Sequence, residues 1–307
     1  MRILILGAGG VGGYFGARLA AAGLDVSFLV RAGRAAQLAR DGLVVLSPLG
    51  DVRMQVSTLT EARPGFQAVL LACKAYDLDG AMAAVAPAVA ADTLVLPLLN
   101  GIGQLNILDT RFTAERVLGG LCQIGVTLTD KGEVQHLNTV QQLAFGPRLP
   151  LQLAGCERLH TLLARGGFSP VLSADIVQRM WEKFVLLAAY AGMTCLMRAP
   201  VGAIVAADDG AALMREILSE CAAVASASGH TPGPVFIAET LALLTQRGSP
   251  GTASMLRDMQ RGARTEHEHI LGDMLLRARR AQIAVPLLRV ANAHLQAYEF
   301  ERASPQQ

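Results

Sequence analysis

The first half of the chain alternates short apolar runs with stretches of helical periodicity. Four of the apolar runs are almost free of polar residues and predict strands: Arg2–Leu6, Val26–Val30, Ala68–Ala72 and Thr93–Pro97. Helical stretches lie near residues 11–22, 34–41 and 79–90. Continuously apolar strands separated by helices are typical of a parallel sheet that helices cover on both faces. We therefore expect an α/β domain in the N-terminal half.

Two places depart from that rhythm. Leu43–Ser47 and Val52–Val56 flank a Pro-Leu-Gly-Asp turn, which predicts a small hairpin. Further along, three short runs lie around an Asp-Lys-Gly turn, namely Val126–Thr129, Val134–His136 and Leu143–Phe145. We interpret these runs as antiparallel strands that close the same sheet.

Beyond about residue 174 the pattern predicts helices only. Asp175 followed by Gln178 is a helix-capping pattern, so a helix should begin at Ile176. Further helices are expected across 208–229, 234–246, 252–261 and 266–282, with a frayed tail at 303–307. The expected fold is an N-terminal α/β domain with a parallel sheet, residues 1–174, followed by an all-helical C-terminal domain, residues 175–307.

Composition excludes several classes of protein. The 307 residues are 52% hydrophobic and 17% charged, which excludes a disordered chain. A net charge of +2 excludes a broad phosphate-binding surface, so we expect no nucleic-acid partner. The longest charge-free apolar stretch, Phe184–Met197, has only fourteen residues, so no membrane-spanning segment is expected. Five cysteines without a Cys-x-x-Cys pair indicate reduced thiols in the cytoplasm.

A glycine-rich loop follows the first predicted strand directly and opens a helix. Its sequence is Gly7-Ala8-Gly9-Gly10-Val11-Gly12. In such a loop Gly7 permits the tight turn, Gly9 lets the backbone approach a pyrophosphate, and Gly12 lets the helix meet the strand closely. The N–H groups at the start of the helix then hold the phosphates. The order strand, turn, helix and second strand favours a dinucleotide site over a merely flexible turn.

The second strand indicates which dinucleotide is bound. A carboxylate about 20 residues after the motif would hold the ribose of NAD. Here Arg31 ends the second strand, and Arg34 follows one helical turn later. Two guanidinium groups match the 2′-phosphate of NADP(H), which we therefore expect as the cofactor. The alternative is that both arginines are solvated surface residues.

Polar residues follow two of the predicted strands. Lys74 comes directly after Ala68–Ala72 and Cys73, and Asn100 follows the strand that ends near Leu99. Ligands of open α/β sheets bind beyond the carboxyl ends of the strands. This location favours contact with cofactor or substrate over ordinary loop polarity.

Lys183 lies near the start of the helix predicted from Ile176 and precedes fourteen apolar or small residues. From position alone we expect its ammonium group to reach out to solvent. If it faces a binding site instead, partial desolvation makes it a competent proton donor.

Two candidates in the helical half are separated by a predicted chain break. Thr265 with Glu268 forms a capping box, which predicts a helix that starts at Glu266. Taken alone, Glu266 is an ordinary acid of a first helical turn. Ser254 begins an earlier helical stretch, about 18 Å from Glu266 if the helix were continuous. Gly262 interrupts that stretch and would let the two residues serve one small substrate.

A metal site is not expected. Glu266, His269 and Asp273 fall on one helical face, but zinc sites usually take ligands from more than one segment, and no second cluster appears in the sequence. No local motif indicates hydrolysis by a serine or cysteine nucleophile either.

Together these features resemble the ketopantoate reductase (2-dehydropantoate 2-reductase) family over nearly the whole chain. The matching segments are Gly7–Gly12, Arg31, Cys73-Lys74-Ala75-Tyr76, Asn100-Gly101, Trp181-Glu182-Lys183, Ser254-Met255-Leu256 and Thr265-Glu266. The resemblance implies a Rossmann-type domain that binds NADPH and a helical substrate domain. It implies NADPH-dependent reduction of ketopantoate to pantoate, on the route to pantothenate and coenzyme A.

The resemblance also implies roles for individual residues. Lys183 would be the proton donor, with Glu266 beside it in the catalytic site. Glu266, Ser254 and Asn100 would line the substrate and nicotinamide site, and Lys74 and Gly125 would touch the cofactor.

One departure bears on the substrate. The family usually carries asparagines four and eight residues after the catalytic lysine, and here those positions are Leu187 and Ala191. Either other residues hold ketopantoate, or the substrate is a different, less polar 2-keto acid or ketone. Two alternative hypotheses for the function are a dehydrogenase of 3-hydroxy acids and a non-catalytic NADP-binding sensor. The apolar composition also suggests a homodimer.

Overall fold

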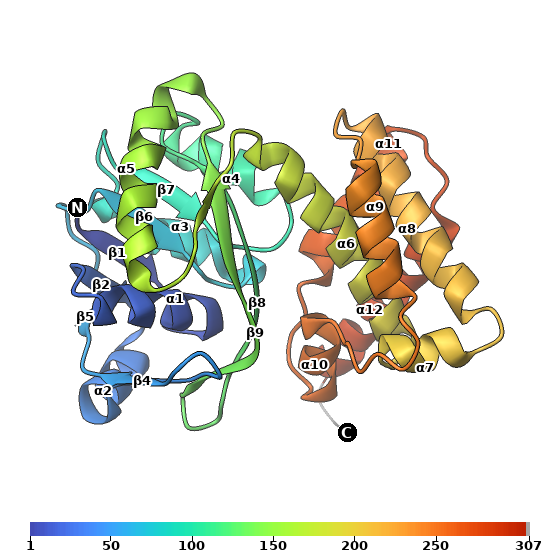
Figure 1. The fold of residues 1–307 in the computed structure, drawn as a ribbon, viewed down its shortest axis with the longest axis horizontal. Coiled ribbons are helices and arrows are strands. Elements are labelled where there is room, and N and C mark those ends of the chain that lie inside the picture. The colour runs from blue at the N-terminus through green and yellow to red at the C-terminus, as the bar shows by residue number, and fades with distance from the viewer. Residues whose placement is uncertain (305–307) are drawn as a thin grey trace. The chain divides into compact units, whose positions relative to one another are not determined.

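The computed structural model describes residues 1–304 (Figure 1). Its contacts divide the chain into two compact units. The α/β unit comprises residues 1–99 and 104–177, and the helical unit comprises residues 100–103 and the chain from 178 onward. The sequence predicted a boundary at 174/175 and did not separate residues 100–103 from the first unit. Of the frayed tail expected at 303–307, residues 305–307 lie outside the described part.

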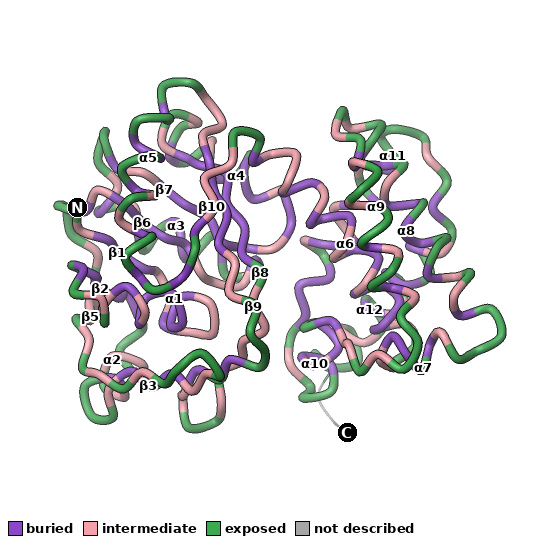
Figure 2. Tube along the Cα trace, in the orientation of Figure 1, coloured by how far each residue is buried: buried purple, intermediate pink, exposed green. Residues whose placement is uncertain are grey.

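The predicted parallel sheet is confirmed. Its strand order is β5-β2-β1-β6-β7, and every neighbouring pair is parallel. The strands are β1 (Ile3–Leu6), β2 (Val26–Leu29), β5 (Ser57–Leu59), β6 (Ala68–Leu71) and β7 (Leu94–Pro97). β2 and β6 are buried along their whole length, as Figure 2 shows for the centre of this sheet. That burial explains why these strands are continuously apolar. β5, a three-residue edge strand with a Ser-Thr start, was not predicted.

Helices flank this sheet as expected, with two additions. The predicted helices correspond to α1 (Gly10–Ala21), α2 (Ala32–Asp41) and α3 (Leu78–Val85). Two helices were not predicted, α4 (Gln104–Phe112) and α5 (Leu153–Leu163). α1 packs so closely on the sheet that a Cβ atom on Gly16 would stand only 2.5 Å or less from ring atoms of Phe28. The glycine loop is therefore fixed to the sheet by the helix that follows it.

The expectation that residues 123–146 close the first sheet is wrong. They belong to one long antiparallel hairpin, β8 (Gly119–Leu128) and β9 (Val134–Gly146), in a second five-stranded sheet. β9 pairs in parallel with β3 (Leu43–Leu46) and with β10 (Val171–Leu172). Val134–His136 and Leu143–Phe145, which the sequence predicted as separate strands, are both parts of β9, whose middle is exposed. The hairpin of β3 with β4 (Val52–Met54) is confirmed as antiparallel.

The helical unit contains helices throughout, and no strand occurs between residue 174 and residue 304. The predicted helices are α6 (Ile176–Met197), α8 (Gly210–Ala227), α9 (Pro234–Leu244) and α10 (Ser254–Gln260). The predicted helix at 266–282 is a π-helical turn, Glu268–Gly272, that continues into α11 (Asp273–Arg280). Two further helices, α7 (Val201–Ala206) and α12 (Pro286–Ala303), were not predicted.

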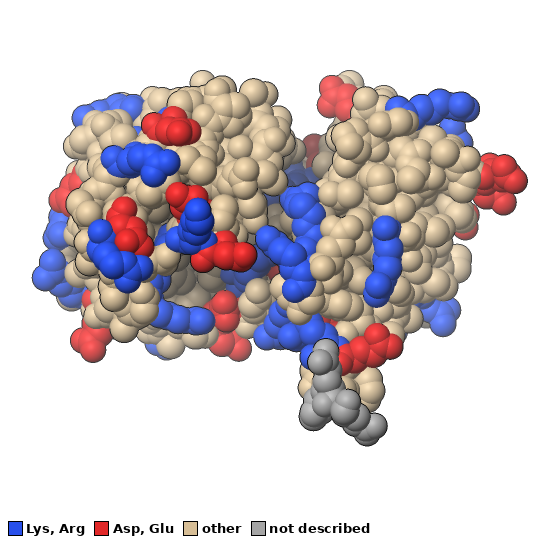
Figure 3. Space-filling model, turned by 90° about the horizontal axis from the view of Figure 1, so that it is seen from below, with Lys and Arg blue, Asp and Glu red and all other residues tan. Residues whose placement is uncertain are grey.

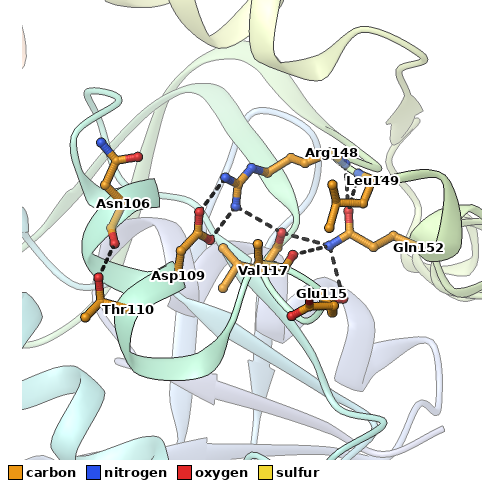
Figure 4. A network of polar contacts seen from close by, with 9 residues as sticks. Asn106, Asp109, Thr110, Glu115, Val117, Arg148, Leu149 and Gln152 are labelled. Carbon is orange, nitrogen blue, oxygen red and sulfur yellow. Dashed lines mark hydrogen bonds and ion pairs between the residues drawn. The ribbon is translucent and has the colours of Figure 1, made fainter.

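A partly buried polar network ties the segment between β9 and α5 to the end of α4 (Figure 4). The guanidinium group of Arg148 donates two hydrogen bonds of 2.6 Å to the carboxylate of Asp109. The Gln152 amide donates to the carbonyls of Ala114, Glu115 and Val117, and its Oε1 accepts from the backbone of Arg148. Gln152 is only 2% exposed, so its hydrogen bonds are not replaceable by water.

On the face of the α/β unit shown in Figure 3, Lys and Arg side chains alternate with Asp and Glu. Charges of both signs limit the attraction of a polyanion to this face. Among the described residues, no helix combines the length and the apolar character needed to cross a membrane.

Candidate functional site

The glycine loop lies between the end of β1 and the start of α1. Gly7 has a φ of +91°, which favours glycine, and its N–H donates to the carbonyl of Leu29 in β2. A Cβ atom on Gly12 would stand 2.2 Å from the carbonyl oxygen of Gly7. The turn and the close helix–strand approach predicted for Gly7 and Gly12 are therefore present in the structure.

The loop also has the features that a pyrophosphate requires. Gly9 is the N-cap of α1, and no side chain caps that helix. The first turn of α1 contains no acidic residue. A Cβ atom on Gly9 would meet no other heavy atom within 4 Å, so the space above this residue is open. An uncapped twelve-residue helix beneath open space fits the phosphates of a dinucleotide.

The β8–β9 hairpin lies beside the same loop. A Cβ atom on Gly10 would stand 3.1 Å from a methyl group of Val126. Gly125 precedes Val126 at an irregularity in the β8–β9 pairing, opposite residues 137–140 of β9. A Cβ atom on Gly125 would stand 2.7 Å from the amide nitrogen of Asn138. The structure therefore brings Gly125 next to the glycine loop, although 113 positions separate it from Gly12 in the sequence.

The two arginines expected to hold a 2′-phosphate have different surroundings. The Arg31 side chain is 88% exposed and has only a 3.5 Å contact with the carboxylate of Asp77. Arg34 is half-buried and donates to the carbonyl of Ala8 at 2.9 Å and to Gln37 at 2.7 Å. Arg31 thus has a guanidinium group accessible to a phosphate. Arg34 holds the backbone of the glycine loop through the carbonyl of Ala8, a contact that the sequence did not predict.

Lys74 lies where the sequence placed it. It follows β6, is half-buried, and is the N-cap of a short 3₁₀ turn, Ala75–Asp77. The carboxyl end of β6 neighbours that of β1, which leads into the glycine loop. Lys74 therefore lies beyond the carboxyl ends of the strands of the first sheet, where ligands of open α/β sheets bind.

Lys183 and Asn100 form the most informative contact of the helical unit. The Lys183 side chain is on the second turn of α6 and is 9% exposed. Its ammonium nitrogen donates to Oδ1 of Asn100 at 3.0 Å. The expectation from position alone, that this ammonium group reaches solvent, is therefore wrong. The amide oxygen of Asn100 therefore fixes the position of this buried ammonium group.

Ser254 and Glu266 lie on either side of the predicted chain break. α10 begins at Ser254, which is exposed, and ends at Gln260. Gly262 then adopts a φ of +66°, which ends the helix. Glu266 is 6% exposed and accepts backbone hydrogen bonds from His269 and Ile270 through its carbonyl. The helix therefore starts just after Glu266 rather than at it.

The capping box predicted at Thr265 and Glu268 is wrong. The hydroxyl and the N–H of Thr265 both donate to Oε1 of Glu299 in α12, at 2.7 and 2.6 Å. A carboxylate 34 residues away thus takes the place expected for the local cap. This contact fixes the segment that contains Glu266.

One polar side chain of α6, that of Tyr190, was not among the candidate site residues predicted from the sequence. Tyr190 is half-buried, and a Cβ atom on Gly251 would stand 2.8 Å from its hydroxyl oxygen. The sequence signal was available, because Tyr190 lies seven residues after Lys183 and so shares its helical face. Within residues 1–304, no group of three or more His, Cys, Asp or Glu side chains could hold a metal ion.

Comparison with known proteins gives consistent results for both halves of the chain. Residues 3–149 match the family model "Ketopantoate reductase PanE/ApbA", and residues 175–299 match the model of its C-terminal part. The uncharacterized oxidoreductase YkpB of Bacillus subtilis is 35% identical over 303 residues, covering 98% of this chain and all of the relative. The 2-dehydropantoate 2-reductase of Halobacterium salinarum is 27% identical, covering 94% and 96%.

A solved structure shows the same similarity. The crystal structure of 2-dehydropantoate 2-reductase from Geobacter metallireducens superposes with a TM-score of 0.88 at 30% identity. The match covers 97% of this chain and 99% of that one. Sequence and fold therefore agree over nearly the full length.

Proposed function

The chain belongs to the ketopantoate reductase family and is an NADP-dependent oxidoreductase, and on that basis we propose that it reduces the 2-keto group of ketopantoate to give pantoate. The single observation that carries the proposal is the buried hydrogen bond between Lys183 and Asn100. It holds an ammonium group in a fixed position near the start of α6, a mostly apolar helix.

Lys183 is the proposed general acid. NADPH, when bound, supplies the hydride that reduces the keto carbon. As the carbonyl oxygen becomes an alkoxide, an ammonium N–H of Lys183 stabilises the charge and then transfers its proton to that oxygen. Asn100 accepts one N–H and so holds the ammonium group in a fixed position. Burial of the ammonium group strengthens these interactions, because fewer water molecules compete for them.

Glu266 and Ser254 are the proposed remaining polar groups of the catalytic and substrate site. Ser254 can donate its hydroxyl to a substrate oxygen from the start of α10. Glu266 is buried next to Thr265, whose bonds to Glu299 fix the local backbone. A buried carboxylate that accepts a hydrogen bond would orient a hydroxyl group or the ammonium group of the acid.

The cofactor residues are proposed from the α/β unit. The backbone of Gly7, Ala8, Gly9, Gly10, Val11 and Gly12 would hold the pyrophosphate at the start of α1. Arg31 would pair with the 2′-phosphate, for which its guanidinium group is exposed. Lys74, Asn100 and Gly125 would contact the rest of the cofactor from the strand ends and the β8–β9 hairpin.

A second candidate substrate is a less polar 2-keto acid. Leu187 and Ala191 lie one and two turns after Lys183, and neither can hydrogen-bond a substrate. A site without amides at these positions discriminates less against substrates that lack a hydroxyl group. The reaction and the roles of Lys183 and Asn100 are the same for this candidate.

The proposal is tested by oxidation of NADPH, followed by absorbance, over a panel of 2-keto and 3-keto acids that includes ketopantoate. We expect turnover with 2-keto acids, and ketopantoate as the preferred member. Preference for a 3-keto acid would contradict the substrate class. NADPH binding without turnover of any member would favour the non-catalytic sensor.

We also propose a cytoplasmic location, because all five cysteines are free thiols, as expected in a reducing compartment. Burial raises the pKa of Cys195 to about 12 and that of Cys156 to about 11, so neither is a reactive thiolate. The homodimer remains a prediction, to be checked by light scattering.

A further inference from the structure

Three side chains of α6 share one helical face. With 3.6 residues per turn, Leu187 lies about 40° from Lys183 around the helix axis, and Tyr190 lies only about 20° away. Tyr190 is about 10.5 Å further along the axis. Tyr190 is therefore the first polar residue that follows Lys183 on this face. Along the helix it lies between Leu187 and Ala191, the two positions that lack amides.

The Tyr190 hydroxyl points at the segment that leads into Ser254. A Cβ atom on Gly251 would stand 2.8 Å from this hydroxyl oxygen and 3.1 Å from Oγ of Ser249. The backbone of Ser249 and Gly251 is anchored, since their carbonyls accept from Gly202 and Val201 in α7. Any side chain at position 251 would displace the phenol. Gly251 thus leaves room for the hydroxyl three residues before Ser254.

This hydroxyl is available for a ligand. In the described part of the chain it makes no hydrogen bond to protein, and Tyr190 is half-buried rather than enclosed. Burial raises the pKa of Tyr190, an effect that the nearby charge of Arg257 partly offsets. The group is accordingly a neutral phenol at physiological pH, able both to donate and to accept a hydrogen bond.

We propose that Tyr190 determines substrate specificity: its hydroxyl hydrogen-bonds a hydroxyl group on the side chain of the 2-keto acid, in place of the amides absent at positions 187 and 191. The inference rests on the proposed function and extends it. It makes a hydroxylated 2-keto acid the preferred substrate class despite Leu187 and Ala191. Tyr190 contributes to substrate selection, whereas Lys183 performs the proton transfer.

Ketopantoate and trimethylpyruvate test the proposal, because trimethylpyruvate is ketopantoate without its hydroxyl group. The ratio of their kcat/KM values is measured for the wild-type enzyme and for Tyr190→Phe. Loss of one neutral hydrogen bond should lower kcat/KM for ketopantoate about 2- to 12-fold, mainly through KM, and leave trimethylpyruvate unchanged. The melting temperature should also stay unchanged, since the hydroxyl has no protein partner within residues 1–304.

Two further variants separate this role from a structural one. Tyr298→Phe is the matched control, because its hydroxyl donates to the carbonyl of Ala263 at 2.8 Å. It should lower the melting temperature and leave the substrate ratio unchanged. Leu187→Asn in the Tyr190→Phe background restores an amide on the same helical face and should restore part of the ratio.

The outcomes separate the inference from the proposed function. A ratio that Tyr190→Phe leaves unchanged refutes the role of Tyr190 while the reductase activity stands. The role of Tyr190 is also refuted, and the reductase activity stands, if the wild-type enzyme reduces other 2-keto acids but neither ketopantoate nor trimethylpyruvate. If the wild-type enzyme reduces no 2-keto acid, the proposed function fails and the role of Tyr190 fails with it.

Discussion

Two glycines of the loop should respond differently to substitution by alanine. An alanine Cβ at position 12 would stand 2.2 Å from the Gly7 carbonyl oxygen, whereas ordinary contacts begin near 3.4 Å. Relieving that overlap requires a backbone shift of roughly 1 Å in a close-packed region. Overpacking of this kind costs about 1–3 kcal/mol. Gly12→Ala should therefore lower the melting temperature by about 2–12 °C.

Gly9→Ala places its Cβ where no protein atom lies within 4 Å. The φ of Gly9 is −87°, which alanine adopts without strain, so stability should change by no more than about 1 kcal/mol. The same Cβ would occupy the space proposed for the pyrophosphate. We expect NADPH affinity to fall about tenfold or more in this variant.

The assay combines thermal unfolding without ligand and titration with NADPH, followed by nucleotide fluorescence. Gly12→Ala should lose both stability and affinity, and Gly9→Ala should lose affinity alone. If Gly9→Ala binds NADPH as tightly as the wild type, the phosphates do not lie over this loop and the assignment of the cofactor site is refuted.

Four further outcomes follow from the structure. Lys183→Ala should lower kcat by about 10²- to 10⁴-fold while NADPH still binds in titrations, and normal turnover would remove Lys183 from the mechanism. Arg31→Ala should raise KM for NADPH about tenfold and leave KM for NADH unchanged, whereas equal effects on both would exclude a 2′-phosphate contact. Gln152→Ala should lower the free energy of unfolding in urea by about 2–4 kcal/mol, with the exposed Gln296→Ala near zero as the control. Burial lowers the pKa of His267 below its ordinary 6.5, an effect that neighbouring Glu268 and Glu299 partly offset. The unfolded chain therefore takes up the proton first, and the free energy of unfolding should fall as the pH drops below about 6.5. That slope should be shallower in His267→Gln, and identical slopes would show that His267 does not contribute.

The strands that could be predicted are those whose environment is uniform. β2 and β6 are buried on both faces, so every residue is apolar and the segment is visible in isolation. β9 is buried at its ends and exposed in its middle, so its sequence suggests two strands with a loop between them. Its parallel pairing with β3, about 90 residues earlier, leaves no local signal.

α12 was missed for a related reason. Its buried face consists of Leu288, Ala291, Asn292 and Leu295, which have the spacing of an amphipathic helix. One of these four positions is an asparagine, and the remaining stripe is too narrow to predict a helix by periodicity.

The features of the candidate site that could be predicted are likewise the local ones. The glycine loop is local, and its turn and helix packing follow from six consecutive residues. The Lys183–Asn100 bond joins residues 83 positions apart, and the Thr265–Glu299 bond joins residues 34 apart. From its position alone, Lys183 was expected to reach solvent, whereas it is buried. A local cap by Glu268 was expected at Thr265, whereas Glu299 of α12 supplies the carboxylate. Such pairings are set by tertiary packing rather than by the neighbouring sequence.

Transfer of a labelled hydride tests the central claim most directly. NADPH in which deuterium replaces both hydrogens at the reactive carbon of its nicotinamide is incubated with the wild-type enzyme and ketopantoate, and the product is examined by mass spectrometry. The account predicts pantoate with the deuterium on its second carbon, and no labelled product with Lys183→Ala on the same timescale. Unlabelled pantoate, or labelled pantoate formed equally fast without the Lys183 ammonium group, would contradict it.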